Sequence, residues 1–456
     1  MAVRVFVAAV LAALGPVSAT LAQPSPPGPS PGPAPGPAPG PAPGPAPGLA
    51  PGPESAAAVD RVLARVERLT GRTFSTRPRV DVLDVEAWRV RVAERFAARM
   101  RPQTLNGLGA TLRVLGVVAP DVDLGSIWAE WATPQSGAYF DVGRDTLVVG
   151  LGVAEPLRDH GELVRAALLA LRSETVDLSA LEAQDATLVS DRARAFEALA
   201  EGEVRYWTRR YGMLFSDELA DEFVSRATTE WTHELVPIAP ARVPAFVVAH
   251  ATFAAEAGER YVEALHDAGG LEAIERAWRL PPRSTEQVLW PDKTHDAEGV
   301  DEPHAVVARD IVDLLPQGFA PCFDGEFGAA GSELVLRLGA DPTRALLAQR
   351  GFGGDRMRSY AHADGRVIVQ WVVASDTTAD AIESFDAARK LLERMYAPTK
   401  DAANRVVVDG AQTDARATTL ADEVLGSVHR KADTIVLFTG LDQSIDVERL
   451  ALRALE

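Results

Sequence analysis

Apolar residues three and four positions apart recur through the first half of the chain and predict a series of amphipathic helices. The first helix is expected to end at Gly71, and its apolar positions are Val59, Val62, Leu63, Val66 and Leu69. A second is expected over 85–100, where Asp84 can act as N-cap. A third is expected over 104–118. This part of the chain is therefore predicted to be mainly helical.

Two longer helical patterns follow, separated by polar residues. The stretch 157–206 predicts two helices with a polar connection between them, and 244–278 predicts a helix broken at Gly269 and Gly270. Glu256, Glu259 and His266 fall on the polar side of the second pattern and are interpreted as a solvated face. The first helix of 157–206 should be buried because its apolar positions are closely spaced: Leu163, Val164, Ala167, Leu168 and Leu171.

Alternating apolar residues predict only a few strands before residue 300. One short strand is expected around Val80 and Val82, and a β-hairpin over 137–149 with its turn near Gly143. From about His304 the pattern becomes mixed. Helices are expected over 306–315, 341–350, 378–396 and 447–455, and strands over 366–373, 405–408 and 434–439. Gly353-Gly354-Asp355 is predicted to form a turn.

These patterns predict an α+β protein with two folded regions. The first, over 54–300, is mainly helical with a small antiparallel sheet. The second, over 301–456, is mixed α/β and is expected to pack on the first.

The first 53 residues have a different character. Residues 1–22 resemble a secretory signal, with Arg4, an apolar run over 5–14 and a small-residue cleavage point at Ala19 or Ala22. Residues 23–53 are rich in Pro, Gly and Ala and predict a disordered, extended linker, because proline removes hydrogen-bond donors and fixes φ. The linker is either a spacer or a biased tail without a binding role. The chain is therefore expected to be exported, to the periplasm or the extracellular space.

Charge and cysteine content narrow the possible partners. The formal net charge of -18 argues against nucleic acid as a partner. No segment after the signal is long and apolar enough to predict a transmembrane helix. The one cysteine, Cys322, excludes an intramolecular disulfide.

Several short motifs occur in an order that suggests a family. The central ones are Gly137-Ala-Tyr-Phe-Asp141, Asp177-Leu178, Asp191 and Glu201-Gly202-Glu203, and the later ones are Pro281-Pro-Arg-Ser-Thr-Glu-Gln287, Gly351-Phe-Gly-Gly-Asp-Arg356, Trp371, and Asp380-Ala381 with Phe385. In this order they resemble secreted bacterial zinc metallopeptidases of the gluzincin type, which have a His-Glu-x-x-His helix and a downstream glutamate ligand. The resemblance implies a zincin-like peptidase scaffold over nearly everything after the linker.

The zinc-binding histidines of that family are absent. By the resemblance, the first ligand position falls on Arg165, the general base on Ala166, the second ligand on Leu169 and the third on Glu201. None of the eight histidines lies four residues from another, and neither arginine nor leucine ligates zinc. The chain is thus interpreted as a degenerate member with four vestigial site positions and no cofactor.

Three functions remain open at this point. The leading hypothesis is a secreted, non-catalytic pseudo-metallopeptidase that binds a protein, a peptide or a cell-envelope component. Arg165 either pairs with the carboxylate of Glu201 or extends into solvent. The alternative is an active hydrolase with a rearranged zinc site that uses His160, Glu162 and Glu201. A third is a purely structural envelope protein. The sequence indicates neither the partner nor the oligomeric state.

Overall fold

The computed structural model describes residues 53–127, 137–150, 160–182, 186, 188–216, 218–219, 243–295, 300–396, 413–420, 423–442 and 444–455. The predicted signal, the linker up to residue 52 and the predicted strand over 405–408 lie outside these residues.

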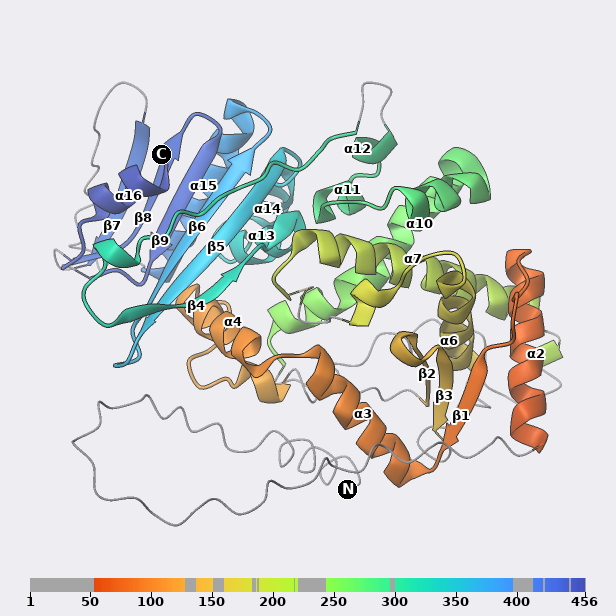
Figure 1. Ribbon diagram of the computed structural model, residues 1–456. Coiled ribbons are helices and arrows are strands. Elements are labelled where there is room, and N and C mark those ends of the chain that lie inside the picture. Colours follow the sequence, from red (N-terminus) through yellow and green to blue (C-terminus); the bar gives the residue numbers. More distant parts are fainter. Residues whose placement is uncertain are drawn as a thin grey trace, which may run out of the picture.

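The first helices begin and end close to where the sequence predicts (Figure 1). Helix α2 (Pro53–Thr70) is followed by Gly71, whose φ of 69° lies in the left-handed region that glycine adopts without strain. Asp84 caps α3 (Val85–Arg99) by accepting a hydrogen bond from the backbone N–H of Ala87. Helix α4 (Pro102–Val114) ends four residues earlier than the predicted stretch.

A three-stranded sheet lies beside these helices in the order β1-β3-β2. The predicted hairpin forms from β2 (Ala138–Asp141) and β3 (Thr146–Gly150), joined by the 3-10 turn η1 (Val142–Arg144). Strand β1 (Arg79–Leu83) pairs with β3 in parallel. The hairpin has the expected antiparallel pairing, but the parallel pairing of β1 differs from the predicted small antiparallel sheet, because the chain passes through α3 and α4 before it returns to the sheet.

Three helices form the centre of the helical region (Figure 1). They are α6 (His160–Ser173), α7 (Asp191–Leu214) and α10 (Ala245–Arg279), with the short turn η2 (Ser179–Glu182) between the first two. Gly269 and Gly270 have non-helical backbone angles inside α10, as predicted. Helices α7 and α10 cross closely at Gly202 and Gly258. A Cβ on Gly202 would lie 2.2 Å from the backbone of Gly258.

The chain then passes through α11 (Thr285–Leu289), α12 (Asp292–His295) and η4 (Val312–Leu314) to a larger sheet. This sheet has six antiparallel strands in the order β4-β5-β6-β9-β8-β7. The strands are β4 (Phe319–Gly325), β5 (Phe352–His362), β6 (Val367–Ser375), β7 (Thr413–Leu420), β8 (Glu423–Lys431) and β9 (Thr434–Thr439). The helices of this region are α13 (Gly328–Leu336), α14 (Pro342–Leu347), α15 (Thr378–Met395) and α16 (Val447–Ala454).

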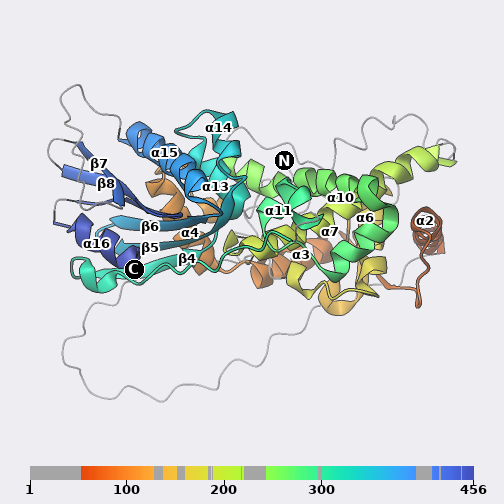
Figure 2. The same ribbon diagram turned by 90° about the horizontal axis from the view of Figure 1, so that it is seen from above.

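The two faces of the large sheet are covered by different parts of the chain (Figure 2). One face packs against α15, α13 and α4, and its apolar cluster includes Leu108, Trp371 and Leu391. The other packs against α16 and the segment that contains Ala308 and Ile311. Helix α4 therefore belongs by sequence to the helical region but packs on the later sheet. The protein is a mixed α+β structure.

Two predictions in the later region are wrong. The stretch 306–315 forms only the turn Val312–Leu314. It otherwise lies extended over the sheet, because that arrangement buries Ala308 and Ile311 without a helix. Gly353-Gly354-Asp355 continues strand β5 instead of turning. A bulge between Phe352 and Gly354 accommodates the glycines within the strand.

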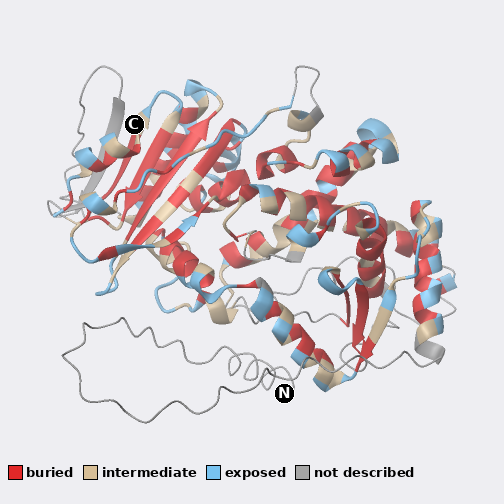
Figure 3. Ribbon diagram, viewed as in Figure 1, coloured by how far each residue is buried: buried red, intermediate tan, exposed pale blue. Residues whose placement is uncertain are grey.

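The buried residues concentrate in the large sheet and along α6 (Figure 3). Within the described part of the chain, no helix is both long enough and apolar enough to cross a membrane.

Candidate functional site

Arg165 and Glu201, two of the four positions expected to be vestigial, face each other across α6 and α7. The Arg165 Nε donates to Glu201 Oε2 at 3.1 Å, and its Nη2 donates to Oε1. The pair is partly exposed, since the side chains are 28% and 21% accessible. The guanidinium therefore holds the Glu201 carboxylate in a two-pronged contact near the protein surface.

The other two of these positions, Ala166 and Leu169, are part of the apolar core. Ala166 is fully buried and Leu169 is 6% exposed, and both pack with residues of α7 and α10. Helix α6 turns these residues inward because its apolar positions follow the helical period. Neither side chain offers a polar atom, so among the four positions only Arg165 and Glu201 carry charge.

Carboxylates surround Arg165. Burial opposes its charge, but the attraction of Glu201, Glu162 and Glu197 outweighs burial, and the pKa of the guanidinium is raised. Glu162 therefore acts on Arg165 by its charge. His160 begins α6, and the position of its side chain lies outside the described structure.

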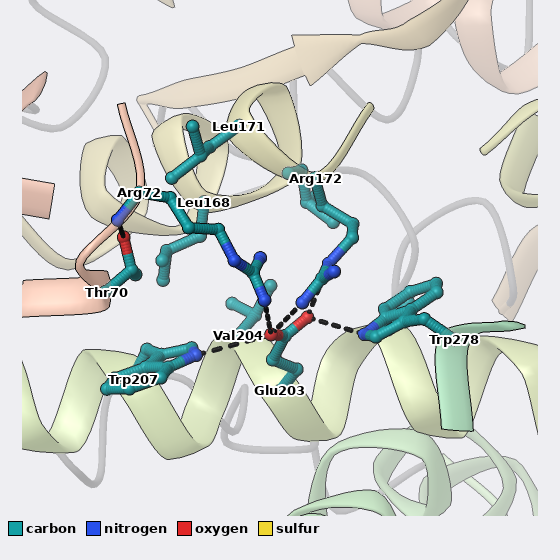
Figure 4. Close-up of a pocket in the computed structure, with 11 residues that line it drawn as sticks. Thr70, Arg72, Leu168, Leu171, Arg172, Glu203, Val204, Trp207 and Trp278 are labelled. Atoms are coloured by element: carbon teal, nitrogen blue, oxygen red, sulfur yellow. Dashed lines mark hydrogen bonds and ion pairs between the residues drawn. The ribbon is translucent and has the colours of Figure 1, made fainter. Parts of the chain in front are cut away.

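A second pair joins the same two helices deeper in the core (Figure 4). The Arg172 Nε donates to Glu203 Oε2 at 3.0 Å, and its Nη2 donates to Oε1. Two indole N–H groups also donate to this carboxylate, from Trp278 at 2.8 Å and Trp207 at 3.3 Å. Arg172 also contacts Glu275 of α10 at 3.1 Å. The Glu203 carboxylate thus accepts hydrogen bonds from three side chains.

Arg72, which lies in the loop after α2, also belongs to this network. It pairs with Glu275, and its guanidinium lies 3.7 Å from Glu203. Burial and the nearby Arg172 lower the pKa of Arg72, while Glu203 opposes that shift. The cavity beside these residues measures about 10 Å³, room for about one water molecule at most. The network therefore fits a structural role better than ligand binding.

Motifs that are far apart in the sequence meet where the helical region contacts the large sheet. The Asp191 carboxylate accepts hydrogen bonds from the backbone N–H of Thr285 at 3.1 Å and from its hydroxyl at 2.6 Å. Burial is the main cause that raises the pKa of Asp191 to about 7; the charge of Asp355 adds to the shift and the Thr285 hydrogen bonds oppose it.

Asp355 lies on the other side of this junction, on β5. Its carboxylate accepts from the backbone N–H groups of Phe327 and Gly328 at the start of α13, and from the Trp371 indole at 2.9 Å. Burial raises the pKa of Asp355 to about 6, and these hydrogen bonds oppose the shift. The Gly-Phe-Gly-Gly-Asp-Arg motif thus positions a buried carboxylate that joins three elements.

Lys293 lies at the centre of a group of three carboxylates. Its ammonium contacts Glu286 at 2.5 Å, Asp301 at 2.6 Å and Asp376 at 2.9 Å. Among the described residues, these three form the one group that brings three potential metal-ligand atoms within 4.8 Å of one another. Burial raises the pKa of Glu286 to about 8 against the effect of Lys293. The lysine supplies the positive charge that the three carboxylates require.

Sequence reasoning missed several of these contacts. Arg172 lies seven residues after Arg165, a spacing that places both on one face of α6, and Glu203 belongs to the quoted Glu-Gly-Glu motif. That spacing could have indicated the second pair. Glu259, predicted to be solvated, is 7% exposed and pairs with Arg205 at 2.7 Å. It is buried because α10 packs closely on α7 at this point.

Comparison with known proteins gives one match, within the later region. A family model described as a domain of unknown function (DUF8575) matches residues 323–443. No curated protein and no solved structure matches the chain. The matched residues include most of the large sheet and the Asp355 side of the junction.

Proposed function

We propose that the protein is an exported, non-catalytic relative of gluzincin-type metallopeptidases that acts by binding a protein, a peptide or a cell-envelope component. Its scaffold is zincin-like under this proposal. Arg165 replaces the positive charge of the zinc ion, and Glu201 is the remaining ligand position.

The observation that carries the proposal is the Arg165–Glu201 contact. The Nε and Nη2 of Arg165 both donate hydrogen bonds to the Glu201 carboxylate. A glutamate whose two oxygens accept from arginine has little capacity left to hold a metal. Ala166 and Leu169 offer no general base and no ligand.

Metal analysis tests the non-catalytic part of the proposal. Untagged protein is purified without chelator, and its zinc content is measured by mass spectrometry beside hydrolysis of a mixed peptide library. We expect no stoichiometric zinc and no hydrolysis above that of a Glu201→Ala variant. About one zinc per chain, with hydrolysis that Glu201→Ala abolishes and Glu272→Gln retains, would instead establish the hydrolase with a rearranged site. Glu272 is a matched control because it lies exposed on α10.

A binding experiment tests the second part. The mature protein is immobilised and exposed to envelope extract, in parallel with Arg165→Glu and Arg192→Gln variants of confirmed fold. We expect a specific partner that wild type and Arg192→Gln retain and that Arg165→Glu binds more weakly. Arg192 is exposed on α7 and leaves the ion pair intact. Recovery of no specific partner by wild type would favour a purely structural envelope protein.

A further inference from the structure

Arg194 is a buried arginine enclosed by three helices. It belongs to the first turn of α7 and is 3% exposed. Its guanidinium lies over the ring of Phe253 on α10, 4.8 Å from the ring centre. On α13, a Cβ added to Gly331 would lie 3.3 Å from Arg194 Nη1, so the missing side chain leaves room for the guanidinium. The three helices thus enclose a positive charge.

Two nitrogens of this guanidinium have no acceptor in the described part of the chain. Arg194 Nε and Nη2 are both buried and make no hydrogen bond there. Asp191 lies one turn earlier and attracts the guanidinium by its charge, but its carboxylate accepts from Thr285 instead. A buried donor without an acceptor is unfavourable, and more so when it carries charge.

The groups around Arg194 do not remove its charge at neutral pH. Burial lowers the pKa of Arg194 to about 10, so the guanidinium is still protonated. The pKa of His250 is held well below its usual value by burial and by Arg194, so this neighbour is neutral. Asp191 and Glu197 attract the arginine from the same helix. None of these groups accepts a hydrogen bond from Nε or Nη2 of Arg194.

Two other arginines of this protein show which chemical group binds to the Nε and Nη2 edge of a guanidinium. Arg165 uses Nε and Nη2 to hold the carboxylate of Glu201, and Arg172 uses the same two nitrogens to hold Glu203. The two parallel N–H groups of this edge match the two oxygens of a carboxylate. In Arg194 the same edge is buried and has no carboxylate partner among the described residues.

We propose that Arg194 anchors a binding site for a small carboxylate, which the Nε and Nη2 edge holds in a two-pronged contact. The carboxylate belongs either to a free small organic acid or to the end of a peptide. The site is distinct from the Arg165–Glu201 pair, because Arg194 precedes Glu201 by seven residues, about 10 Å along α7. It does not depend on the proposed function.

Thermal unfolding with sodium formate tests the site. The formate concentration is varied against sodium gluconate at constant ionic strength, with wild type, Arg194→Gln and Arg192→Gln. We expect a saturable rise in Tm of about 2 °C for wild type and Arg192→Gln, and none for Arg194→Gln. An equal response in all three proteins, or no response in wild type, would overturn the proposal.

Two further measurements identify the source of the carboxylate and remove the dependence on a variant that folds poorly. In NMR, we expect saturation transfer from wild-type protein to formate, and excess acetate should abolish this transfer. If wild type shows no saturation transfer to formate, the proposal is overturned even if Arg194→Gln does not fold. Trialanine is then compared with trialanine amide. Competition with formate by the acid alone assigns the site to a peptide terminus, and competition by neither assigns it to a free small acid.

Discussion

Two arginine–glutamate pairs join α6 to α7, and they differ mainly in their surroundings. In both pairs the arginine uses Nε and Nη2 on one carboxylate. The side chains of Arg165 and Glu201 are 28% and 21% exposed, whereas those of Arg172 and Glu203 are 3% and 7% exposed. Water therefore reaches the outer pair, whereas the inner pair is shielded from water and depends on its protein partners.

This difference separates two roles within the Glu-Gly-Glu motif. Its first glutamate occupies the position that the family resemblance assigns to a zinc ligand. Its second accepts hydrogen bonds from Arg172, Trp207 and Trp278 in the core. The packing of α7 therefore accounts for the second glutamate without a metal, and the two pairs should respond differently to mutation.

Arg172→Met should produce the largest loss of stability. It leaves the buried Glu203 carboxylate with the two indoles and the more distant Arg72. Breaking one side of a buried pair costs about 3–5 kcal/mol, which denaturant unfolding measures. Arg172→Lys is the matched control and should lose less stability, because lysine keeps the positive charge but lacks the planar pair of N–H donors of arginine. A loss below about 1 kcal/mol for Arg172→Met would mean that water compensates the carboxylate.

The next largest effect concerns Asp191, a buried carboxylate of α7 whose hydrogen-bond partner is Thr285 and not an arginine. Its folded pKa of about 7 lies above the ordinary value of 3.8, so the folded state binds the additional proton between these pH values. The free energy of unfolding should therefore fall as pH rises from 4 to 7 and then level off. The change is at most about 4 kcal/mol, since each pKa unit corresponds to about 1.4 kcal/mol.

Urea unfolding at pH 5, 6, 7 and 8 measures that slope. Asp191→Asn should flatten it, because asparagine can still accept from Thr285 without titrating. Asp355 and Glu286 also have raised pKa values and leave a residual slope of the same sign. An unchanged slope in Asp191→Asn would exclude Asp191 as its origin.

The local pattern of the sequence predicted most of the helical region. The break at Gly269-Gly270, the cap at Asp84 and the hairpin over 137–149 depend on neighbouring residues. The extended segment with Ala308 and Ile311 was wrongly predicted as a helix, because what decides its conformation is the sheet face beneath it. The conformation of Gly353 and Gly354 was also wrongly predicted, because it depends on pairing with β6, where Gly354 lies opposite Ala374.

The candidate site was predictable only in part. The approach of Arg165 to Glu201 was a hypothesis based on the family resemblance, which assigns both residues to ligand positions. The burial of Glu203, the position of Lys293 among three carboxylates and the enclosure of Arg194 did not follow. Each depends on segments brought together by the tertiary fold, and a charged residue in a polar stretch does not reveal which segment will cover it.

Gly202→Ala tests whether the close helix crossing positions both pairs. The added methyl would lie 2.2 Å from the Gly258 backbone, so α7 and α10 must separate. We expect a loss of about 2 kcal/mol. Gly161→Ala on α6 is the control, because its methyl meets nothing within 4 Å, and it should be neutral or stabilising. Equal stability of the two variants would show that the crossing can relax.

Arg165→Met should have the smallest effect, a loss of about 1 kcal/mol, because water can solvate the partly exposed Glu201 once the arginine is gone. A double-mutant cycle with Glu201→Gln isolates the pair energy from other effects of each change. The same cycle on Arg172 and Glu203 should give a larger coupling, since those groups are shielded from water. If the outer pair couples as strongly as the inner one, exposure does not distinguish them, and Arg165 would be a structural residue, against the proposal that it replaces the charge of a metal.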